Sequence, residues 1–402
     1  MLCLLLKKYA LLVLIIESSL LLNISYPYLD ENLPVSSFIE QRSKVSIIKY
    51  SNNGDYFSAA YNDGTIRLWD VKKNNSSMSV SAHKSRILYL IFSTDNKYII
   101  TSSEDKDIKV WLLPDLQLYK ETQIDFIPSY LTSSPDNLTL SVGGNNGDIF
   151  CYLISDLKVV KTLPGEGKKI TYITYSSTGQ HCTSGYEDGT IKVWSAFDKS
   201  LSTILAHSES ILFLDYVNKD NYLLSAGNDY KVKFWVTKTW KSKEVEWDLP
   251  QNGRFFVPSS GKRFLAVGCS DNSIEFLLMP AGVYSDPFRP NISGFTSFCI
   301  SADDKFILLG GTSGEIKIYR NPILVKQYNA VMDKGNESML RGKYELAVIK
   351  YNEAMSIYPE KEAEEKLKEA QKKKMEKQQN QIENIKNIQQ KTKKNIEEMK
   401  RK

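Results

Sequence analysis

The sequence predicts an all-β fold, a seven-bladed β-propeller with a small C-terminal α-helical extension. Two observations predict this fold. An aromatic or large apolar residue recurs every 41 or 42 residues, and a tight-turn signal precedes each recurrence at a constant distance. The recurring residues are Trp69, Trp111, Tyr152, Trp194, Trp235, Leu277 and Tyr319. A fixed period of about 40 residues is the mark of a repeat architecture.

Each recurring residue closes a predicted β-strand. Apolar, mostly β-branched residues stand three positions and one position before it, such as Ile66 and Leu68 before Trp69. This alternation with a period of two is typical of a strand. Six positions before the recurring residue comes a short polar residue, which suits the positive φ of a hairpin turn. These turn residues are Asp63, Asp105, Asn146, Asp188, Asp229, Asp271 and Ser313.

Each repeat of about 42 residues therefore has room for four short antiparallel strands and for no helix. A single four-stranded sheet cannot bury both of its faces, so neighbouring sheets must stack on one another. Closing the stack into a ring leaves only short, protected edges. We expect residues 35–327 to form this ring of seven sheets.

Composition and charge narrow the function classes. Of the 402 residues, 42% are hydrophobic and 25% are charged, which disfavours a membrane bundle and general disorder. Residues 360–402 hold 14 Lys or Arg and 9 Asp or Glu, which accounts for the whole net charge of +5. This segment contains no aromatic residue, so it cannot stack on bases, and nucleic-acid binding is disfavoured.

The five cysteines form no CxxC pair and have no companion histidines at metal-ligand spacing. We therefore predict no metal site and no cofactor. Cys151 and Cys182 stand at buried positions of two different repeats, which favours free thiols in a reducing compartment. The cytoplasm is the predicted location.

Residues 1–34 form a hydrophobic leader with two open interpretations. The apolar run from Tyr9 to Ile16 is far shorter than the roughly 20 residues that a membrane span needs. The basic pair Lys7–Lys8 before this run matches a signal peptide or signal anchor. The other interpretation is a disordered leader. Membrane contact is expected only through residues 1–22, and a membrane-anchored or secreted propeller is the alternative to a cytoplasmic one.

The repeats resemble the WD-repeat family, whose period is about 40–45 residues. The resemblance covers roughly residues 35–327, and Trp69–Asp70 in the stretch NDGTIRLWD is its fullest dipeptide. The other repeats lack the Asp, and three of them replace the Trp. The resemblance implies that the N-terminal segment, Val35 to Glu40, supplies the outermost strand of the last blade. Pro322 to Tyr328 then leads out of the disc, and the exchange of these two roles stays open.

The resemblance also implies a buried polar network in each blade, which links a His, a Ser or Thr, the turn Asp and the Trp. The second repeat matches it with His83, Ser103, Asp105 and Trp111. The fifth repeat matches it with His207, Asp229 and Trp235, while Gly227 replaces the hydroxyl residue. Such a network stabilises a fold only when every member is satisfied, so we expect the fifth repeat to be looser than the second.

Three tyrosines are candidate partner-binding residues on the face that carries the turn Asp residues. Tyr61 and Tyr186 replace the hydroxyl residue of the first and fourth repeats, and Tyr230 follows the turn Asp of the fifth. Aromatic residues at a loop rim are suitable anchors for a protein partner. The alternative is that these side chains fill the space that the missing network leaves.

The C-terminal segment changes to a helical period after Tyr328. Residues 328–359 resemble a tetratricopeptide-repeat hairpin, with Gly335, Gly342, Ala347 and Ala354 at its small-residue positions. Residues 360–402 form a charged helix with a thin apolar stripe, whose interpretation as a coiled coil or as an isolated helix stays open. The stripe consists of Leu367, Ala370, Met375, Ile382, Ile385, Ile388, Ile396 and Met399.

The sequence predicts a protein-protein interaction scaffold and not an enzyme. No phosphate loop, zinc-protease or nucleophile-elbow motif occurs, and we predict no catalytic residue and no small-molecule substrate. The loops of a propeller present a wide, pre-organised binding surface on a rigid ring. We expect the propeller to bind a protein or peptide and the helical tail to bind a second partner within a multi-subunit assembly.

Overall fold

The computed structural model describes residues 29–39, 43–73, 76–195 and 200–401. The chain divides into two compact units, and the propeller is the unit Glu31–Asn321. Most of the predicted leader lies outside the described residues. No helix in the described part of the chain has a stretch both long and apolar enough to span a bilayer.

The propeller contains seven four-stranded antiparallel sheets, which confirms the predicted fold. Blades 1 to 3 follow the chain in order. Blade 1 consists of β2 (Val45–Tyr50), β3 (Tyr56–Tyr61), β4 (Thr65–Asp70) and β5 (Ser76–Ser81). Blade 2 consists of β6 (Ile87–Phe92), β7 (Tyr98–Ser103), β8 (Asp107–Leu112) and β9 (Gln117–Gln123). Blade 3 consists of β10 (Tyr130–Ser133), β11 (Thr139–Gly143), β12 (Ile149–Leu153) and β13 (Val159–Leu163).

Blades 4 to 6 have the same strand order. Blade 4 consists of β14 (Ile170–Tyr175), β15 (His181–Tyr186), β16 (Thr190–Ser195) and β17 (Ser200–Leu205). Blade 5 consists of β18 (Ile211–Val217), β19 (Tyr222–Gly227), β20 (Lys231–Val236) and β21 (Lys241–Asp248). Blade 6 consists of β22 (Gly253–Pro258), β23 (Phe264–Cys269), β24 (Ile274–Leu278) and the very short β25 (Val283–Tyr284).

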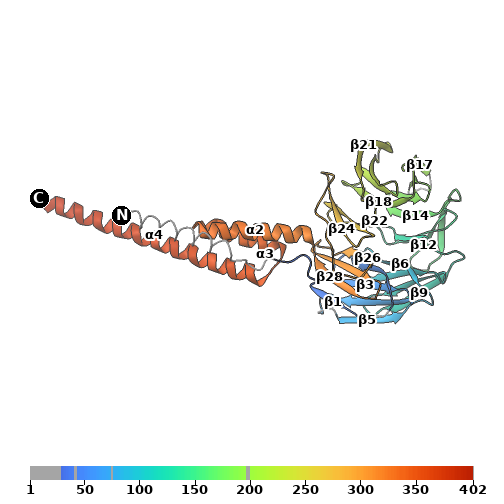
Figure 1. Ribbon diagram of the computed structural model, residues 1–402, viewed down its shortest axis with the longest axis horizontal. Coiled ribbons are helices and arrows are strands. Elements are labelled where there is room, and N and C mark those ends of the chain that lie inside the picture. The colour runs from blue at the N-terminus through green and yellow to red at the C-terminus, as the bar shows by residue number, and fades with distance from the viewer. Residues whose placement is uncertain (1–28, 40–42, 74–75, 196–199, 402) are drawn as a thin grey trace, which may run out of the picture. The chain divides into compact units, whose positions relative to one another are not determined.

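The N-terminal strand closes the ring. Blade 7 combines β26 (Phe295–Ile300), β27 (Phe306–Gly311) and β28 (Ile316–Arg320) with β1 (Ser36–Phe38). Ser36 pairs with Ile318 and Phe38 with Ile316, and Figure 1 shows the blue β1 beside the orange β28. The predicted role of this N-terminal segment is confirmed by Ser36–Phe38, while Glu40 lies outside the described residues, and the exchanged assignment is wrong. The last blade is therefore held by segments from both ends of the propeller unit.

The helical unit contains α2 (Pro322–Leu340), α3 (Tyr344–Ile357) and α4 (Lys361–Arg401). Its first helix begins at Pro322, six residues before the predicted boundary at residue 328. Proline suits the first turn of a helix because its φ is already helical and its missing N–H has no intrahelical partner there. The helical period therefore starts inside the segment that we expected only to lead out of the disc.

The α2–α3 crossing depends on one small residue. A Cβ at Gly335 would lie 2.5 Å from a ring atom of Tyr351, so any side chain there would force the helices apart. Tyr351 is fully buried, and its hydroxyl donates to Asn336 at 2.8 Å. The Asn329 side chain also exchanges two hydrogen bonds with the backbone of Leu29, which packs on the same core. The hairpin geometry is as expected, while its membership of the tetratricopeptide-repeat family stays a prediction.

Candidate functional site

A chain of hydrogen bonds runs through blade 2. The Trp111 indole N–H donates to the Thr101 hydroxyl at 3.0 Å, and this hydroxyl lies 2.8 Å from His83 Nε2. His83 Nδ1 lies 3.1 Å from the Asp105 carboxylate, which also accepts the backbone N–H groups of Lys84 and Asp107. A neutral His83 with its proton on Nδ1 satisfies every group in this chain.

The hydroxyl of this network is Thr101, and the prediction of Ser103 is wrong. Trp111 pairs directly with Ile99 across the strands, so its indole N–H meets the diagonal neighbour two residues further on. That neighbour is Thr101, whereas Ser103 lies another two residues along β7. Ser103 instead donates to the carbonyl of Ser85 and accepts the backbone N–H of Asp105.

Blade 5 has a complete network of the same kind, with its hydroxyl again two residues beyond the residue that pairs with the Trp. Ser225 receives the Trp235 indole N–H at 2.9 Å and lies 2.8 Å from His207 Nε2. His207 Nδ1 lies 2.8 Å from Asp229. The expectation that blade 5 is looser because of Gly227 is wrong, since glycine occupies a position that the network does not use. A Cβ at Gly227 would lie only 2.4 Å from His207 Nδ1, so the position excludes a side chain.

Tyr61 and Tyr186 are each only 1% exposed, so the prediction that they anchor a partner is wrong. Tyr186 accepts a hydrogen bond from Ser184, which receives the Trp194 indole N–H. The phenol therefore takes the place that histidine has in blades 2 and 5, as the space-filling alternative predicted. Tyr230 is 41% exposed and stays a candidate for partner contact.

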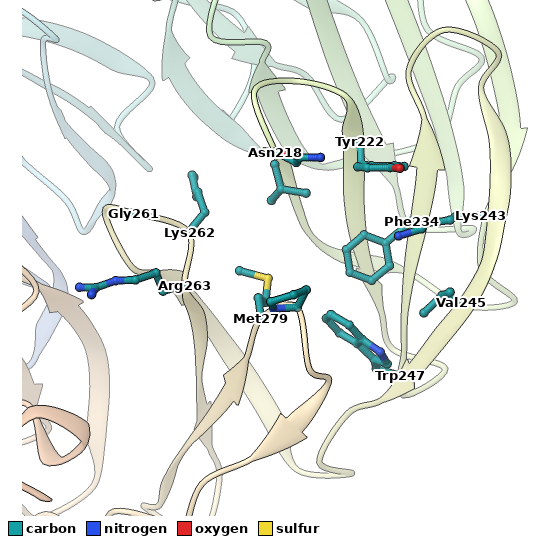
Figure 2. Close-up of a pocket in the computed structure, with 12 residues that line it drawn as sticks. Asn218, Tyr222, Phe234, Lys243, Val245, Trp247, Gly261, Lys262, Arg263 and Met279 are labelled. Atoms are coloured by element: carbon teal, nitrogen blue, oxygen red, sulfur yellow. The ribbon is translucent and has the colours of Figure 1, made fainter. Parts of the chain in front are cut away.

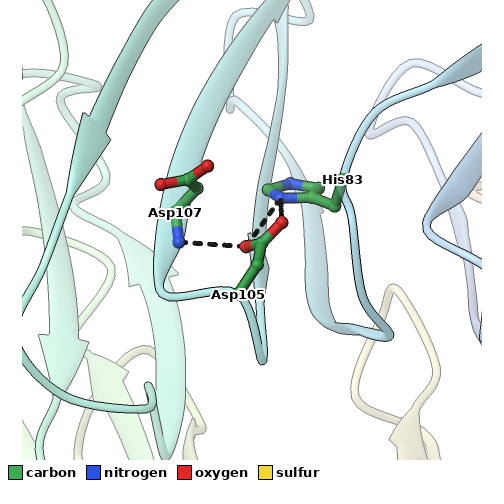
Figure 3. Close-up of side chains that lie close together, drawn as sticks. All are labelled: His83, Asp105 and Asp107. Carbon is green, nitrogen blue, oxygen red and sulfur yellow. Dashed lines mark hydrogen bonds and ion pairs between the residues drawn. The ribbon is translucent and has the colours of Figure 1, made fainter.

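His83, Asp105 and Asp107 also form a cluster of potential metal ligands (Figure 3). The dashed lines in Figure 3 show that Asp105 already accepts from His83 and from the Asp107 backbone N–H. The Asp107 carboxylate lies 3.9 Å from Lys109 Nζ. We therefore interpret this cluster as part of the blade's structural network.

The two network histidines are expected to be mostly neutral at pH 6.5. Burial lowers the pKa of His83 and His207 below 6.5, and attraction to Asp105 or Asp229 offsets this only in part. The two groups stabilise the fold above pH 6.5, and this stabilisation is lost as the pH falls through their folded-state pKa values. Side-chain NMR of the three histidines against pH checks this; a midpoint above 6.5 for His83 or His207 would contradict it.

The turn between the first two strands of each blade carries a residue with positive φ at one repeating position. The seven residues are Gly54, Asn96, Asn137, Gly179, Asp220, Lys262 and Asp304. Four of these side chains accept a backbone N–H from the same turn of the preceding blade, at 2.7–3.3 Å. The bonds join Asn53 to Asn96, Thr94 to Asn137, Ser177 to Asp220 and Ser260 to Asp304.

This bond between blades is missing at Gly54, Gly179 and Lys262, and hollows lie beside the last two. Gly179 has no side chain to accept it, and a hollow of about 400 Å³ lies between blades 3 and 4. Lys262 has no acceptor atom, and a groove of about 560 Å³ lies between blades 5 and 6. Lys262 instead forms an ion pair with Asp215 of blade 5. Burial raises the pKa of Asp215, and Lys262 partly opposes this.

One part of the lining of the groove between blades 5 and 6 is apolar (Figure 2). Phe234 and Trp247 meet edge to face with ring centroids 4.7 Å apart. The β24–β25 turn contributes Met279 and also packs against Trp247, where a Cβ at Gly282 would lie 2.3 Å from the indole nitrogen. Figure 2 shows Phe234, Trp247 and Met279 grouped along the groove. A volume of this size is typical of a ligand-binding site.

Basic residues border this groove. Lys262 pairs with Asp215, and Arg263 lies 3.4 Å from Asp304. Lys243 on β21 lies over the ring of Tyr222, with its Nζ 4.7 Å from the centroid. Among the described residues, no carboxylate forms an ion pair with Lys243. An apolar groove with one uncompensated cation at its edge suits an apolar side chain that is flanked by a carboxylate.

This groove was not predicted from the sequence. Lys243, Val245 and Trp247 alternate along β21, and such alternation puts three side chains on one face of the strand. A second signal was Lys262 at a turn position where four other repeats have Asn or Asp. Neither signal is enough to predict a groove. The two walls belong to different blades, and the sequence does not show how closely these blades pack.

The repeats that match a known family model are the four that keep the Trp. The family model described as "WD domain, G-beta repeat" matches residues 32–70, 74–111, 157–195 and 198–236. The crystal structure of the Cps50 (Swd1) β-propeller domain of Myceliophteria thermophila has a TM-score of 0.63 at 14% identity, over 71% of this chain and 98% of that domain. That likeness supports the fold.

Curated relatives match over part of their length. The WD repeat-containing protein 91 homolog of Dictyostelium discoideum is 28% identical over 52% of this chain. Periodic tryptophan protein 2 of Arabidopsis thaliana is 22% identical over 68%, and the ciliary WD repeat-containing protein ctxp80 of Euplotoides octocarinatus is 23% identical over 67%. This chain spans 28%, 29% and 38% of the lengths of these relatives.

Proposed function

Since this chain belongs to the WD-repeat family of β-propellers, whose members generally act as protein-interaction scaffolds and are typically not enzymes, we propose that its propeller binds a peptide segment of a partner protein in the groove between blades 5 and 6. The groove combines an apolar floor with an uncompensated lysine. This observation carries the proposal. The helical unit is the second interaction module of the scaffold, within a multi-subunit assembly.

The proposed ligand is an acidic peptide with an aliphatic or aromatic anchor. The anchor side chain fits against Phe234, Trp247 and Met279, where it exchanges water for apolar contacts. A neighbouring Asp or Glu of the peptide reaches Lys243 at the edge of the groove. Among the described residues, Lys243 has no ion-pair partner. The turn-to-turn bond that joins four other pairs of neighbouring blades is absent beside this groove.

A reducing location such as the cytoplasm is part of this proposal. Cys182, Cys269 and Cys299 are buried and form no disulfide. Free thiols are usual in the cytosol, where reductants keep them unpaired. Burial raises the pKa of Cys269 to about 11, and those of Cys182 and Cys299 to about 12, so these thiols are not activated nucleophiles.

Selection of random phage-displayed peptides on the full chain tests the groove. We expect enriched peptides to carry an apolar anchor next to Asp or Glu. Lys243→Glu is expected to weaken binding of a selected peptide by about tenfold or more, because it replaces an attraction with a repulsion. Fluorescence polarisation with the labelled peptide measures this change.

Lys120→Glu is the matched control. Lys120 lies over Tyr119 at 5.5 Å on β9, the outer strand of blade 2, in the same type of contact as Lys243 over Tyr222. The control variant is expected to bind the peptide like the wild type. Equal affinity of the Lys243→Glu variant and the wild type would refute the groove as the binding site.

A further inference from the structure

The helix α4 has two parts with different surroundings. Its first turns pack on the hairpin through Ala363 and Ala370, which are fully buried, and through Leu367. Lys377 donates to the carbonyl of Gly342 at the α2–α3 turn. Figure 1 shows α4 running on beyond the ends of α2 and α3. The C-terminal part of α4 is therefore a long helix without a covering element in the described chain.

This second part carries a heptad pattern. Eight residues follow one another in alternating steps of three and four, which is the spacing of the contact seam in a coiled coil. They are Met375, Gln378, Ile382, Ile385, Gln389, Thr392, Ile396 and Met399. The first two of these residues lie at the level of the hairpin turn, where Gln378 lines a hollow with Tyr344 and Leu346, and three heptads follow from Ile382 to Met399. Three to four successive heptads indicate a coiled coil, and a strict period of seven winds two helices into a left-handed supercoil.

The apolar side chains of this seam lie in solvent. Ile382 and Ile385 are 54% and 55% exposed, and Met399 is 69% exposed. Between residues 376 and 401, Ile388 is the one apolar residue outside the seam, and it lies directly beside the seam. The rest of the helix surface is charged or amide-bearing. Such one-sided exposure of isoleucine favours burial against another helix.

We propose that this seam pairs with the same seam of a second copy of the chain, in a parallel and in-register dimer. Lys386 and Lys393 flank the seam on one side, whereas Gln381, Ile388 and Asn395 flank it on the other. In a parallel pair, each lysine lies beside a neutral residue of the partner helix. An antiparallel pair would place lysines against lysines, at a cost from like charges.

The polar seam residues support the same register. In the parallel arrangement, Gln389 faces Gln389 of the second copy, and an amide can both donate and accept a hydrogen bond across the interface. A polar residue in the seam lowers stability but selects one register, since a shift of one heptad leaves the amide against Ile382 or Ile396. The dimer is therefore specific in register and moderate in strength.

This inference rests on the proposed role of the helical unit as an interaction module, and it names the partner of that module. It does not depend on the groove. The peptide assay and the dimer assay use different variants and different readouts, so either can fail while the other succeeds. A dimer would carry two grooves and gain affinity for partners that present two peptide segments.

Sedimentation equilibrium of the full chain tests the pairing. We expect a mass of twice 45.8 kDa at micromolar concentration and a return to 45.8 kDa on dilution. The double variant Ile382→Glu with Ile385→Glu is expected to weaken dimerisation by more than about a hundredfold, because it puts four carboxylates into the seam of the dimer. The double variant Asn380→Glu with Asn387→Glu adds the same charge on the opposite face and should dimerise like the wild type.

Cross-linking tests the orientation in a Cys3→Ser background. A Met399→Cys chain under mild oxidation is expected to form a covalent dimer, since the two positions face one another in a parallel pair. In an antiparallel pair, Met399 lies opposite Met375 of the second copy. The two Met399 positions are then about 36 Å apart along the helix. If covalent dimers form only when Met375→Cys chains are mixed with Met399→Cys chains, the parallel arrangement is overturned. A wild-type mass of 45.8 kDa at every concentration would overturn the proposal as a whole.

Discussion

Replacing Gly310 with alanine is expected to lower the free energy of unfolding by about 2–3 kcal/mol. Gly310 lies on β27 of blade 7, against Val45 at the start of β2 of blade 1. A Cβ at this position would lie 2.4 Å from Val45 Cγ1 and 2.8 Å from Val45 Cβ. Neither atom belongs to a flexible chain end, so the two blades must move apart at the junction that closes the ring. Urea unfolding followed by tryptophan fluorescence measures the loss.

Two variants control this experiment. Adding Val45→Ala to Gly310→Ala removes Cγ1, the nearest clashing atom, and leaves only Cβ at 2.8 Å. The double variant should therefore be more stable than the sum of the single effects implies. Gly261→Ala should be nearly neutral, because its nearest neighbour is the flexible side chain of Arg263 at 3.5 Å. An unchanged stability of the Gly310→Ala variant would show that blades 7 and 1 do not meet as closely as the structure places them.

Replacing Thr101 with valine is expected to cost about 2–4 kcal/mol of stability. The change keeps the shape of the side chain and removes the hydroxyl that joins Trp111 to His83. Both partners are then left buried with an unsatisfied nitrogen, and each such group costs about 1–3 kcal/mol. Thr101 is fully buried, so water cannot replace the hydroxyl without local opening.

Ser103→Ala is the matched control for Thr101→Val, because it removes a hydroxyl from the same strand, two residues away. We expect a loss of about 1 kcal/mol, since Ser103 bonds only to backbone groups of its own blade. Thermal unfolding of both variants compares the two hydroxyls. A larger loss from Ser103→Ala than from Thr101→Val would restore the assignment that the sequence favoured.

The propeller could be predicted because its signals are local and repeated. Each recurring residue, such as Trp111, has its turn residue and its alternating neighbours within six positions, and seven copies agree in spacing. A further repeating signal passed unnoticed. The residue nine positions before each recurring residue is always small, because the inner strand of the next blade packs there. These residues are Ala60, Ser102, Gly143, Gly185, Ala226, Gly268 and Gly310.

The details of the site could not be predicted because they depend on pairing across strands and blades. The choice between Thr101 and Ser103 rests on which residue lies diagonal to Trp111, and the strand register decides this. The burial of Tyr61 and Tyr186 depends on how their blades fill the space of a missing histidine. The groove lies beside Lys262, whose side chain has no atom that can accept a backbone N–H from the preceding blade, and this contact cannot be seen in one repeat alone.

The helical unit was predicted in outline. The small residues at the hairpin crossing were read correctly from Gly335, whose position against Tyr351 tolerates no side chain. The start of α2 at Pro322 was missed, because its first turn is a short continuous apolar run, PILV, whose spacing does not distinguish a helix from a strand. The apolar stripe of α4 was expected as one feature, whereas the structure divides it between packing on the hairpin and an exposed heptad seam.

The most direct test of the account is a crystal structure of this chain with a peptide from the phage selection. We predict that the apolar side chain of the peptide lies between blades 5 and 6, in contact with Trp247 and Met279, and that its carboxylate lies within ion-pair distance of Lys243. A peptide bound on the face with the turn Asp residues, in contact with Tyr230 and remote from Trp247, would contradict the account.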